Sequence, residues 1–255
     1  MLSDKEVLEN KIEEARRFFG IDSYPGNLFE FLGKKELIEE HKVLLFKQDL
    51  DKLSGFIGYI NDFTIICVNY KRNIGHQNFT LAHEIGHMFL HNGISKSDLN
   101  PENPENEKEE IEANYFASEL IYPKKFVTED FTFVIKNNLF KQKNWDKLAD
   151  FINSLCEKYG TSFKFTFNKM SNGYFRNYKK RSSFYNKFKN HIGNLSEAFP
   201  KYVHVVDFKH EYYQVYMEPY NYMKQLVKEL VDRQELGLET GEAIIEKYQR
   251  MGDKH

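Results

Sequence analysis

The sequence is poor in cysteine and has no long apolar run, and each shortage excludes a class of protein. Its two cysteines, Cys67 and Cys156, are too few for the disulfide framework that holds a small secreted domain together. No segment approaches the roughly 18 apolar residues of a membrane-spanning helix. Residues 1–20 alternate charged and apolar side chains, unlike the apolar centre of a signal peptide. We therefore expect a cytoplasmic protein with no membrane partner.

An excess of charge of one sign is missing as well. The 255 residues carry a formal net charge of −2, with a pI near 6.5. Such a balance gives no global reason to expect nucleic acid as a partner. Apolar residues make up 41% of the chain and aromatic residues 16%, which is enough for the core of one large domain or two modest ones.

Hydrophobic spacing predicts a small sheet after the first helices. Residues 3–19 repeat apolar side chains at helical spacing, and a short helix is expected over 34–41. Three strand-like runs rich in aromatic and β-branched residues follow, at 41–48, 55–60 and 63–69. Because the last two runs are separated by a two-residue turn, we expect a hairpin and a small antiparallel sheet.

The stretch TLAHEIGHMFLH, residues 80–91, follows these strands and carries the pattern H-E-x-x-H at His83, Glu84 and His87. Residues four apart on a helix differ by only about 40° around its axis, so both imidazoles project from one face and can share one ion. The opposite face is apolar, with Leu81, Ala82, Ile85, Met88 and Phe89. Two neutral imidazoles and a carboxylate hold Zn²⁺ with one position left for water. Glu84 could take a proton from that water.

A further histidine, His91, is expected to lie outside this site. Helical residues eight apart are separated by about 12 Å along the axis, too far for His91 to share an ion with His83. We interpret His91 as a residue at the C-terminal end of the helix, where the helix dipole favours it. The position six residues after His87 is Gly93 rather than a third histidine, so the third ligand must come from elsewhere.

The predicted helix over 107–121 offers this ligand. On a helical wheel Glu112 lies about 100° from the centre of the apolar stripe and is expected to face water. Glu109 and Glu110 each lie about 50° from that centre, on opposite flanks. Asn114, four residues after Glu110, shares its face and could accept a hydrogen bond from a ligand histidine. A solvated acidic first turn, favoured by the helix dipole, is the alternative.

The chain after residue 144 has a different character. An amphipathic helix over 145–159, a break at Gly160 and a second helical repeat resemble a helix-turn-helix. Residues 161–196 hold eight Lys or Arg, nine Phe or Tyr and no Asp or Glu. The cations could neutralise phosphates. The candidates for stacking on bases are Phe184, Tyr185 and Phe188. An aromatic core beneath a solvated basic face is the competing explanation.

Two motifs carry a resemblance to a known family. FTLAHEIGHMFLH at 79–91 and EIEANYFASELIYP at 110–123 resemble the ImmA/IrrE family of metallopeptidases, in which H-E-x-x-H is followed by E-x-x-A-N-x-F-A. The resemblance is specific over about 55–125 and weaker over 145–175. One departure is visible at 75–78, where GHQN lacks the arginines usual in the family.

The resemblance implies a site and a substrate class. The implied zinc ligands are His83, His87 and Glu110, and the implied catalytic base is Glu84. The resemblance also implies thermolysin-like active-site helices. Many members of the family cleave or inactivate a repressor encoded beside them on a mobile element, and others act in stress responses.

We therefore predict an α+β protein in three parts. Residues 1–140 form a zinc metallopeptidase-like domain with a small antiparallel sheet and thermolysin-like active-site helices, and 141–176 form a helix-turn-helix-like segment. Residues 177–255 form a mixed α+β region that docks a substrate or partner, with strands within 203–218 and two closing helices.

The predicted function is that of a zinc-dependent endopeptidase that cleaves a regulatory protein, a helix-turn-helix repressor of a mobile element or stress response. The alternative is a metal-containing DNA-binding or sensory regulator without proteolytic activity. The hydrogen-bond donor that would stabilise the transition state stays open among His76, Tyr115 and Tyr122.

Overall fold

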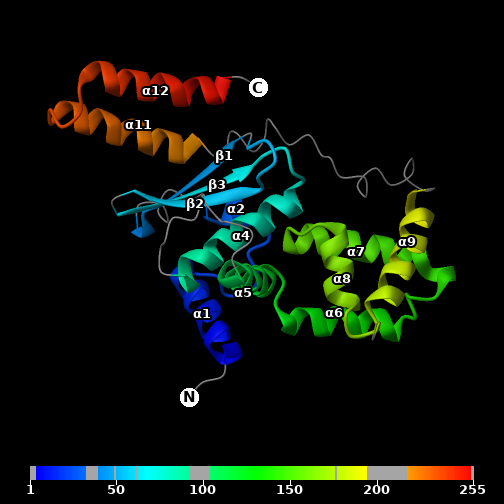
Figure 1. Ribbon diagram of the computed structural model, residues 1–255. Coiled ribbons are helices and arrows are strands. Elements are labelled where there is room, and N and C mark those ends of the chain that lie inside the picture. The colour runs from blue at the N-terminus through cyan, green and yellow to red at the C-terminus, as the bar shows by residue number, and fades with distance from the viewer. Residues whose placement is uncertain are drawn as a thin grey trace.

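The computed structural model describes residues 4–32, 40–48, 50–60, 62–91, 104–175, 177–193 and 217–253. In these ranges helices surround one small three-stranded sheet (Figure 1), so the α+β prediction is confirmed. The short helix expected over 34–41 and the strands expected within 203–218 fall largely outside the described residues. No helix of the described ranges is both long and apolar enough to cross a membrane.

The sheet is mixed rather than purely antiparallel. Strand β2, Gly55–Ile60, pairs antiparallel with β3, Phe63–Asn69, as the hairpin prediction requires. Strand β1, Val43–Gln48, pairs parallel with β3, from Val43 opposite Thr64 to Gln48 opposite Asn69. The expectation of an all-antiparallel sheet is therefore wrong for β1. The reason lies in β3, whose last four residues are all buried: a strand buried on both faces takes the central position and accepts a partner on each side.

Ten α-helices are described around this sheet. They are α1 (Asp4–Phe18), α2 (Leu28–Leu32), α4 (Ile74–Leu90), α5 (Pro104–Ile121), α6 (Lys124–Lys136), α7 (Trp145–Tyr159), α8 (Phe163–Ser171), α9 (Tyr178–Gly193), α11 (Met217–Asp232) and α12 (Leu238–Asp253). Helix α4 packs on β2 and β3 and crosses α5. Figure 1 shows α6 to α9 as a group beside α4 and α5, with the α11–α12 hairpin on the other side of the sheet.

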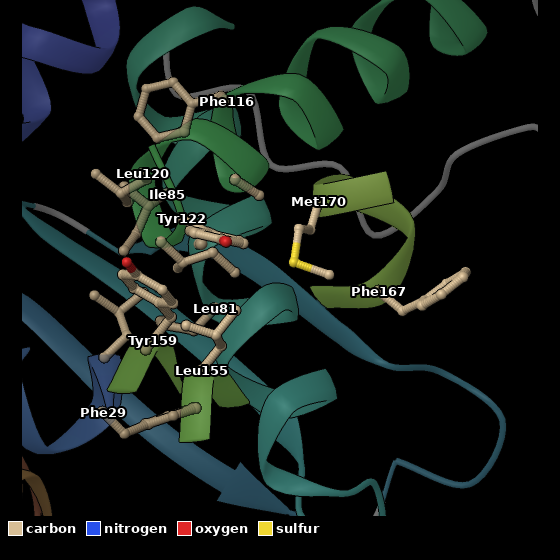
Figure 2. Close-up of a cluster of buried hydrophobic side chains, with 14 of the residues drawn as sticks. Phe29, Leu81, Ile85, Phe116, Leu120, Tyr122, Leu155, Tyr159, Phe167 and Met170 are labelled. Carbon is tan, nitrogen blue, oxygen red and sulfur yellow. The ribbon is translucent and has the colours of Figure 1, made fainter. Parts of the chain in front are cut away.

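One hydrophobic core extends from Ile12 of α1 to Ile192 of α9. Figure 2 shows how side chains from distant segments meet in it, with Leu81 of α4, Phe116 of α5 and Tyr159 of α7 in one cluster. The rings of Tyr122 and Tyr159 stack with 4.2 Å between centroids, and both hydroxyls donate to Asp130. The eight described α-helices from α1 to α9 and the sheet therefore share one interior. The division of the chain at 140 and 176 stays a prediction.

Helices α7 and α8 form the short helix–turn–helix that the sequence predicts, but α8 is packed on the rest of the protein. Gly160 ends α7 in a left-handed conformation, φ 63°, and the Ser162 hydroxyl accepts a hydrogen bond from the backbone of α8. Phe167 and Met170 are buried. Lys169 Nζ donates to Ser118 and Glu119 of α5. A recognition helix must present a face to the DNA groove, and most of the surface of α8 is instead used in packing.

Three aromatic residues of α9, Phe184, Tyr185 and Phe188, pack in or against the core. Phe188 has no exposed surface. Phe184 and Tyr185 both pack against Phe167, with 5.9 and 5.0 Å between ring centroids. Stacking on bases is therefore excluded for the fully buried Phe188 and disfavoured for the half-buried Phe184 and Tyr185, whose rings pack against Phe167. An aromatic core beneath a basic face is the explanation that the structure supports.

The start of α4 fits closely against the turn between α7 and α8. A Cβ on Gly75 would collide with the backbone of Thr161 and Ser162. Three residues later, Asn78 donates from its side chain to the Gly160 carbonyl over 2.9 Å, and this contact is buried. The absence of a side chain at Gly75 therefore allows the helix that carries H-E-x-x-H to dock on the α7–α8 turn.

We expect Gly75→Ala to lower the free energy of unfolding by about 1–3 kcal/mol, because backbone atoms cannot move aside as a flexible side chain can. Chemical denaturation followed by circular dichroism measures this change. Gly58→Ala is the matched control, since a Cβ there meets nothing within 4 Å. Equal stability of the two variants would contradict the close fit.

Candidate metal centre

Helix α4 presents the polar and apolar faces that the sequence predicts. Asn73 caps its N-terminus by accepting a hydrogen bond from the His76 backbone, and His91 caps its C-terminus. Leu81, Ala82 and Ile85 have no exposed surface. The apolar face therefore anchors the helix in the core. The interpretation of His91 as a helix C-terminal residue is confirmed.

A glycine at the crossing of α4 and α5 lets the two helices approach closely. A Cβ on Gly86 would lie 3.1 Å from Ala113 Cα and 3.3 Å from the ring of Phe116. Because Gly86 precedes His87 and Ala113 lies one turn after Glu110, this contact brings the start of α5 over the histidine face of α4. Glu110 is thereby placed opposite both histidines.

Three side chains converge at this crossing. The Nε2 atoms of His83 and His87 lie 3.0 Å apart. They lie 3.2 and 3.3 Å from the two carboxylate oxygens of Glu110. One potential ligand atom from each residue falls within 4.8 Å of the others, and this is the metal-binding group found among the described residues. Glu110, rather than Glu109 or Glu112, therefore faces the histidines.

The donor set fits a divalent cation. His83 Nδ1 lies 3.2 Å from Asn114 Oδ1. An amide oxygen only accepts hydrogen bonds, so His83 carries its proton on Nδ1 and directs a lone pair from Nε2 towards Glu110. Glu110 Oε1 is buried and accepts no hydrogen bond from the described residues. Lone pairs and a carboxylate that face one another need a positive charge between them, and a two-His, one-carboxylate set suits Zn²⁺.

The pKa shifts of His83 and Glu110 agree with a requirement for positive charge at this position. Burial opposes protonation of His83, but Glu110 and Glu84 outweigh it and raise the His83 pKa. The two imidazoles beside Glu110 hold the pKa of its carboxyl well below the usual range. A proton on His83 and a metal ion therefore compete for the position between the imidazoles and Glu110.

Glu84 lies beside the cluster and differs from Glu110 in its electrostatics. It is buried, and this burial raises the pKa of its carboxyl, a rise that Glu110 enhances and the neighbouring histidines oppose. Strand β2 closes over it, because a Cβ on Gly55 would lie 3.5 Å from Glu84 Oε1 and 2.5 Å from Thr80. A carboxylate with a raised pKa in a cleft is suited to accept and return a proton.

The cluster opens into a cleft of about 360 Å³ between β2 and α4. The cleft is lined by Ser54, Gly55, Phe56, Ile57, His76, Phe79, Thr80, His83, Glu84, His87, Glu110 and Asn114. Its walls combine the charged cluster with the apolar side chains of Phe56, Ile57 and Phe79. The contribution of β2 is not visible in the sequence, because it depends on where the hairpin docks on α4.

Of the three candidate transition-state donors, one lines this cleft. His76 Nε2 lies 3.2 Å from Ser54 Oγ, and burial together with Arg72 lowers the His76 pKa, which favours the neutral imidazole. Tyr122 is fully buried and donates to Asp130 instead. Tyr115 lies in a different cleft, beside α1.

Two residues that the sequence interpretation set aside adjoin the cluster. His91 Nδ1 lies 2.8 Å from His87 Nδ1, and His91 Nε2 lies 3.4 Å from Glu112 Oε2. The Glu112 side chain is 22% exposed, so the expectation that it faces water is wrong. The i, i+4 spacing of His87 and His91 was a signal for their contact. The approach of Glu112 depends on the α4–α5 crossing.

These residues lie in a segment that matches a known family. Residues 38–168, about half of the chain, match peptidase family M78, described as the IrrE N-terminal-like domain. The chain belongs to this M78 family. The metallopeptidase ImmA of Bacillus subtilis (strain 168) is 30% identical over 100 residues, which cover 39% of this chain and 59% of ImmA. The M78 chain thus spans about three fifths of the length of this curated relative.

The metal-free M78 chain should lose stability in acid through Glu110. Because its folded-state pKa is depressed, the carboxylate contributes stability above its unfolded-state pKa, and this contribution is lost as the pH falls. We expect the free energy of unfolding to fall more steeply from about pH 5 to about pH 3 in the wild type than in Glu110→Gln. Urea unfolding with a chelator present measures how the free energy of unfolding of each protein changes with pH. Equal pH dependence in the two proteins would contradict a depressed pKa of Glu110.

Proposed function

We propose that this chain is a zinc-dependent metalloendopeptidase of the H-E-x-x-H plus Glu type. The observation that carries the proposal is the convergence of His83, His87 and Glu110 beside Glu84 in one cleft. The first three side chains would hold the ion, with Asn114 orienting His83. Zn²⁺ suits this donor set, although other first-row ions are accepted by the same ligands.

The residues of the cleft have separate tasks in peptide hydrolysis. A zinc ion held by these residues would act as a Lewis acid, polarising the peptide carbonyl and lowering the pKa of water. Glu84 takes the proton from the attacking water and passes it to the leaving amine, a transfer that its raised pKa favours. His76, as a neutral donor in the same cleft, is our candidate for stabilising the negative charge that develops on the carbonyl oxygen.

The cleft suits an extended polypeptide. Strand β2 is an outer strand of the described sheet, and Gly55, Phe56 and Ile57 line the cleft along it. A substrate segment could add beside β2 through backbone hydrogen bonds, with its side chains against Phe56 and Phe79. The substrate would then need a segment that is extended or that unfolds locally.

A helix-turn-helix repressor of a mobile element or a stress response is our proposed substrate, acted on in the cytoplasm. The support is the resemblance of the two motifs to the ImmA/IrrE family and the identity with ImmA. We also keep 1–140 and 141–176 as the protease-like and helix-turn-helix-like parts, with a docking role for 177–255. Within this last part α9 contributes Phe188 to the common core, so docking is best sought on its basic outer face and on α11–α12.

Glu84→Gln tests the catalytic assignment. Loss of the proton carrier should reduce cleavage of candidate repressors by about 10²–10⁴-fold, while zinc content stays stoichiometric. Gel-based cleavage assays and metal analysis measure the two quantities. Glu129→Gln, an exposed carboxylate on α6, is the control and should cleave normally. Cleavage that survives Glu84→Gln would contradict the proposal.

The alternative function, a DNA-binding regulator without proteolytic activity, would depend on the basic face of α9. We expect no measurable affinity for duplex DNA at low salt, because Phe184, Tyr185 and Phe188 pack in or against the core and the net charge is balanced. Fluorescence anisotropy over a salt series measures this affinity. Tight binding that weakens steeply with salt and is lost on neutralising Lys179, Lys180 and Arg181 would favour the alternative.

A further inference from the structure

Three polar side chains, His87, His91 and Glu112, contact one another in series, beginning at the metal-binding cluster. His87 Nδ1 faces His91 Nδ1 at 2.8 Å, and His91 Nε2 faces Glu112 Oε2 at 3.4 Å. The side chains of His87 and His91 are 6% and 7% exposed. Lys108 Nζ lies 3.5 Å from the other oxygen of Glu112. The two histidines are therefore largely shielded from water. The series of contacts ends at the Glu112 carboxylate, beside the exposed Lys108.

The Glu112 carboxylate determines which ring nitrogens of His91 and His87 donate hydrogen bonds. An ionised carboxylate only accepts hydrogen bonds, so the proton of a neutral His91 lies on Nε2, towards Glu112. His91 Nδ1 is then an acceptor, and its partner at 2.8 Å, His87 Nδ1, must donate. His87 consequently carries its proton on Nδ1 and has a lone pair on Nε2, the atom that faces His83 and Glu110.

We propose that His91 and Glu112 are positioning residues that hold His87 in the tautomer and orientation required for metal binding. The inference rests on the proposed metal site and extends it, since His91 does for His87 what Asn114 does for His83. Each ligand imidazole thus has its far nitrogen engaged by a partner. Such partners orient a ligand ring and increase its basicity.

Two other roles for His91 agree less well with the contacts. His91 is not a member of the metal-binding group, and its two ring nitrogens face His87 and Glu112. A role limited to ending α4 would require only its backbone, which donates to the His87 carbonyl over 3.0 Å. Neither role accounts for a buried imidazole between a ligand histidine and a carboxylate.

Metal affinity tests this inference without depending on catalysis. Zinc dissociation constants of the full chain are measured by competition with a chromophoric chelator. We expect His91→Ala to weaken zinc binding by about 10–100-fold and His91→Asn, whose side-chain oxygen can take the place of Nδ1, to restore at least part of that loss. Substitution with Co²⁺ adds a readout of geometry, because its visible spectrum should change in His91→Ala and return towards the wild type in His91→Asn.

A double-mutant cycle tests whether Glu112 acts through His91. Glu112→Ala should weaken zinc binding in the wild-type background and have no further effect in the His91→Ala background. His191→Ala is the matched control, because it removes another histidine paired with a carboxylate, Asp146 at 2.6 Å, outside the cleft. Its zinc affinity should equal that of the wild type.

The outcomes separate this inference from the function on which it rests. A wild type that binds no zinc would contradict the proposed metal site. A wild type that binds zinc while His91→Ala binds it equally well would overturn the positioning role alone. Equal weakening of zinc binding in His91→Ala and His91→Asn, or additive effects of the Glu112 and His91 substitutions, would also overturn it.

Discussion

The close crossing of α4 and α5 at Gly86 and Ala113 is the constraint on which the site depends. Each helix alone carries only part of a metal centre: two histidines and a buried carboxylate on α4, and one carboxylate on α5. The missing side chain at Gly86 lets the helices approach until Glu110 lies within 3.3 Å of both histidines. A bulkier residue there would move the carboxylate away from the histidines.

Other parts of the fold support this crossing from outside. The turn between α7 and α8 receives the start of α4 at Gly75 and accepts a hydrogen bond from Asn78, while Lys169 of α8 binds the end of α5. The α7–α8 segment, which resembles a helix-turn-helix, therefore packs against both α4 and α5 and stabilises their crossing. A rigid support of this kind holds ligand side chains in place before the ion arrives, which reduces the cost of ordering them.

The two carboxylates illustrate how position alone separates chemical roles. Glu84 and Glu110 lie in the same cleft, yet the pKa of one is raised by burial and the pKa of the other is lowered by the imidazoles that face it. The same residue type is thereby suited to proton transfer in one place and to ligation of a cation in the other. On our proposal, His91 and Glu112 extend this arrangement outwards by fixing the proton of His87.

The sequence by itself determined the local features: the helix with His83 and His87 on one face, the apolar side opposite them, the Gly160 turn and the β2–β3 hairpin. These follow from periodicity and turn chemistry over a few residues, so no distant contact is needed to predict them. Periodicity left Glu109 and Glu110 equivalent, and the choice of Glu110 came from the resemblance of its motif to the ImmA/IrrE family. The parallel pairing of β1, the convergence of Glu110 with both histidines and the approach of Glu112 to His91 were decided only by the tertiary structure. Each depends on the register between segments far apart in the chain, and that register is set by side-chain packing at their contact, which no pattern within either segment records.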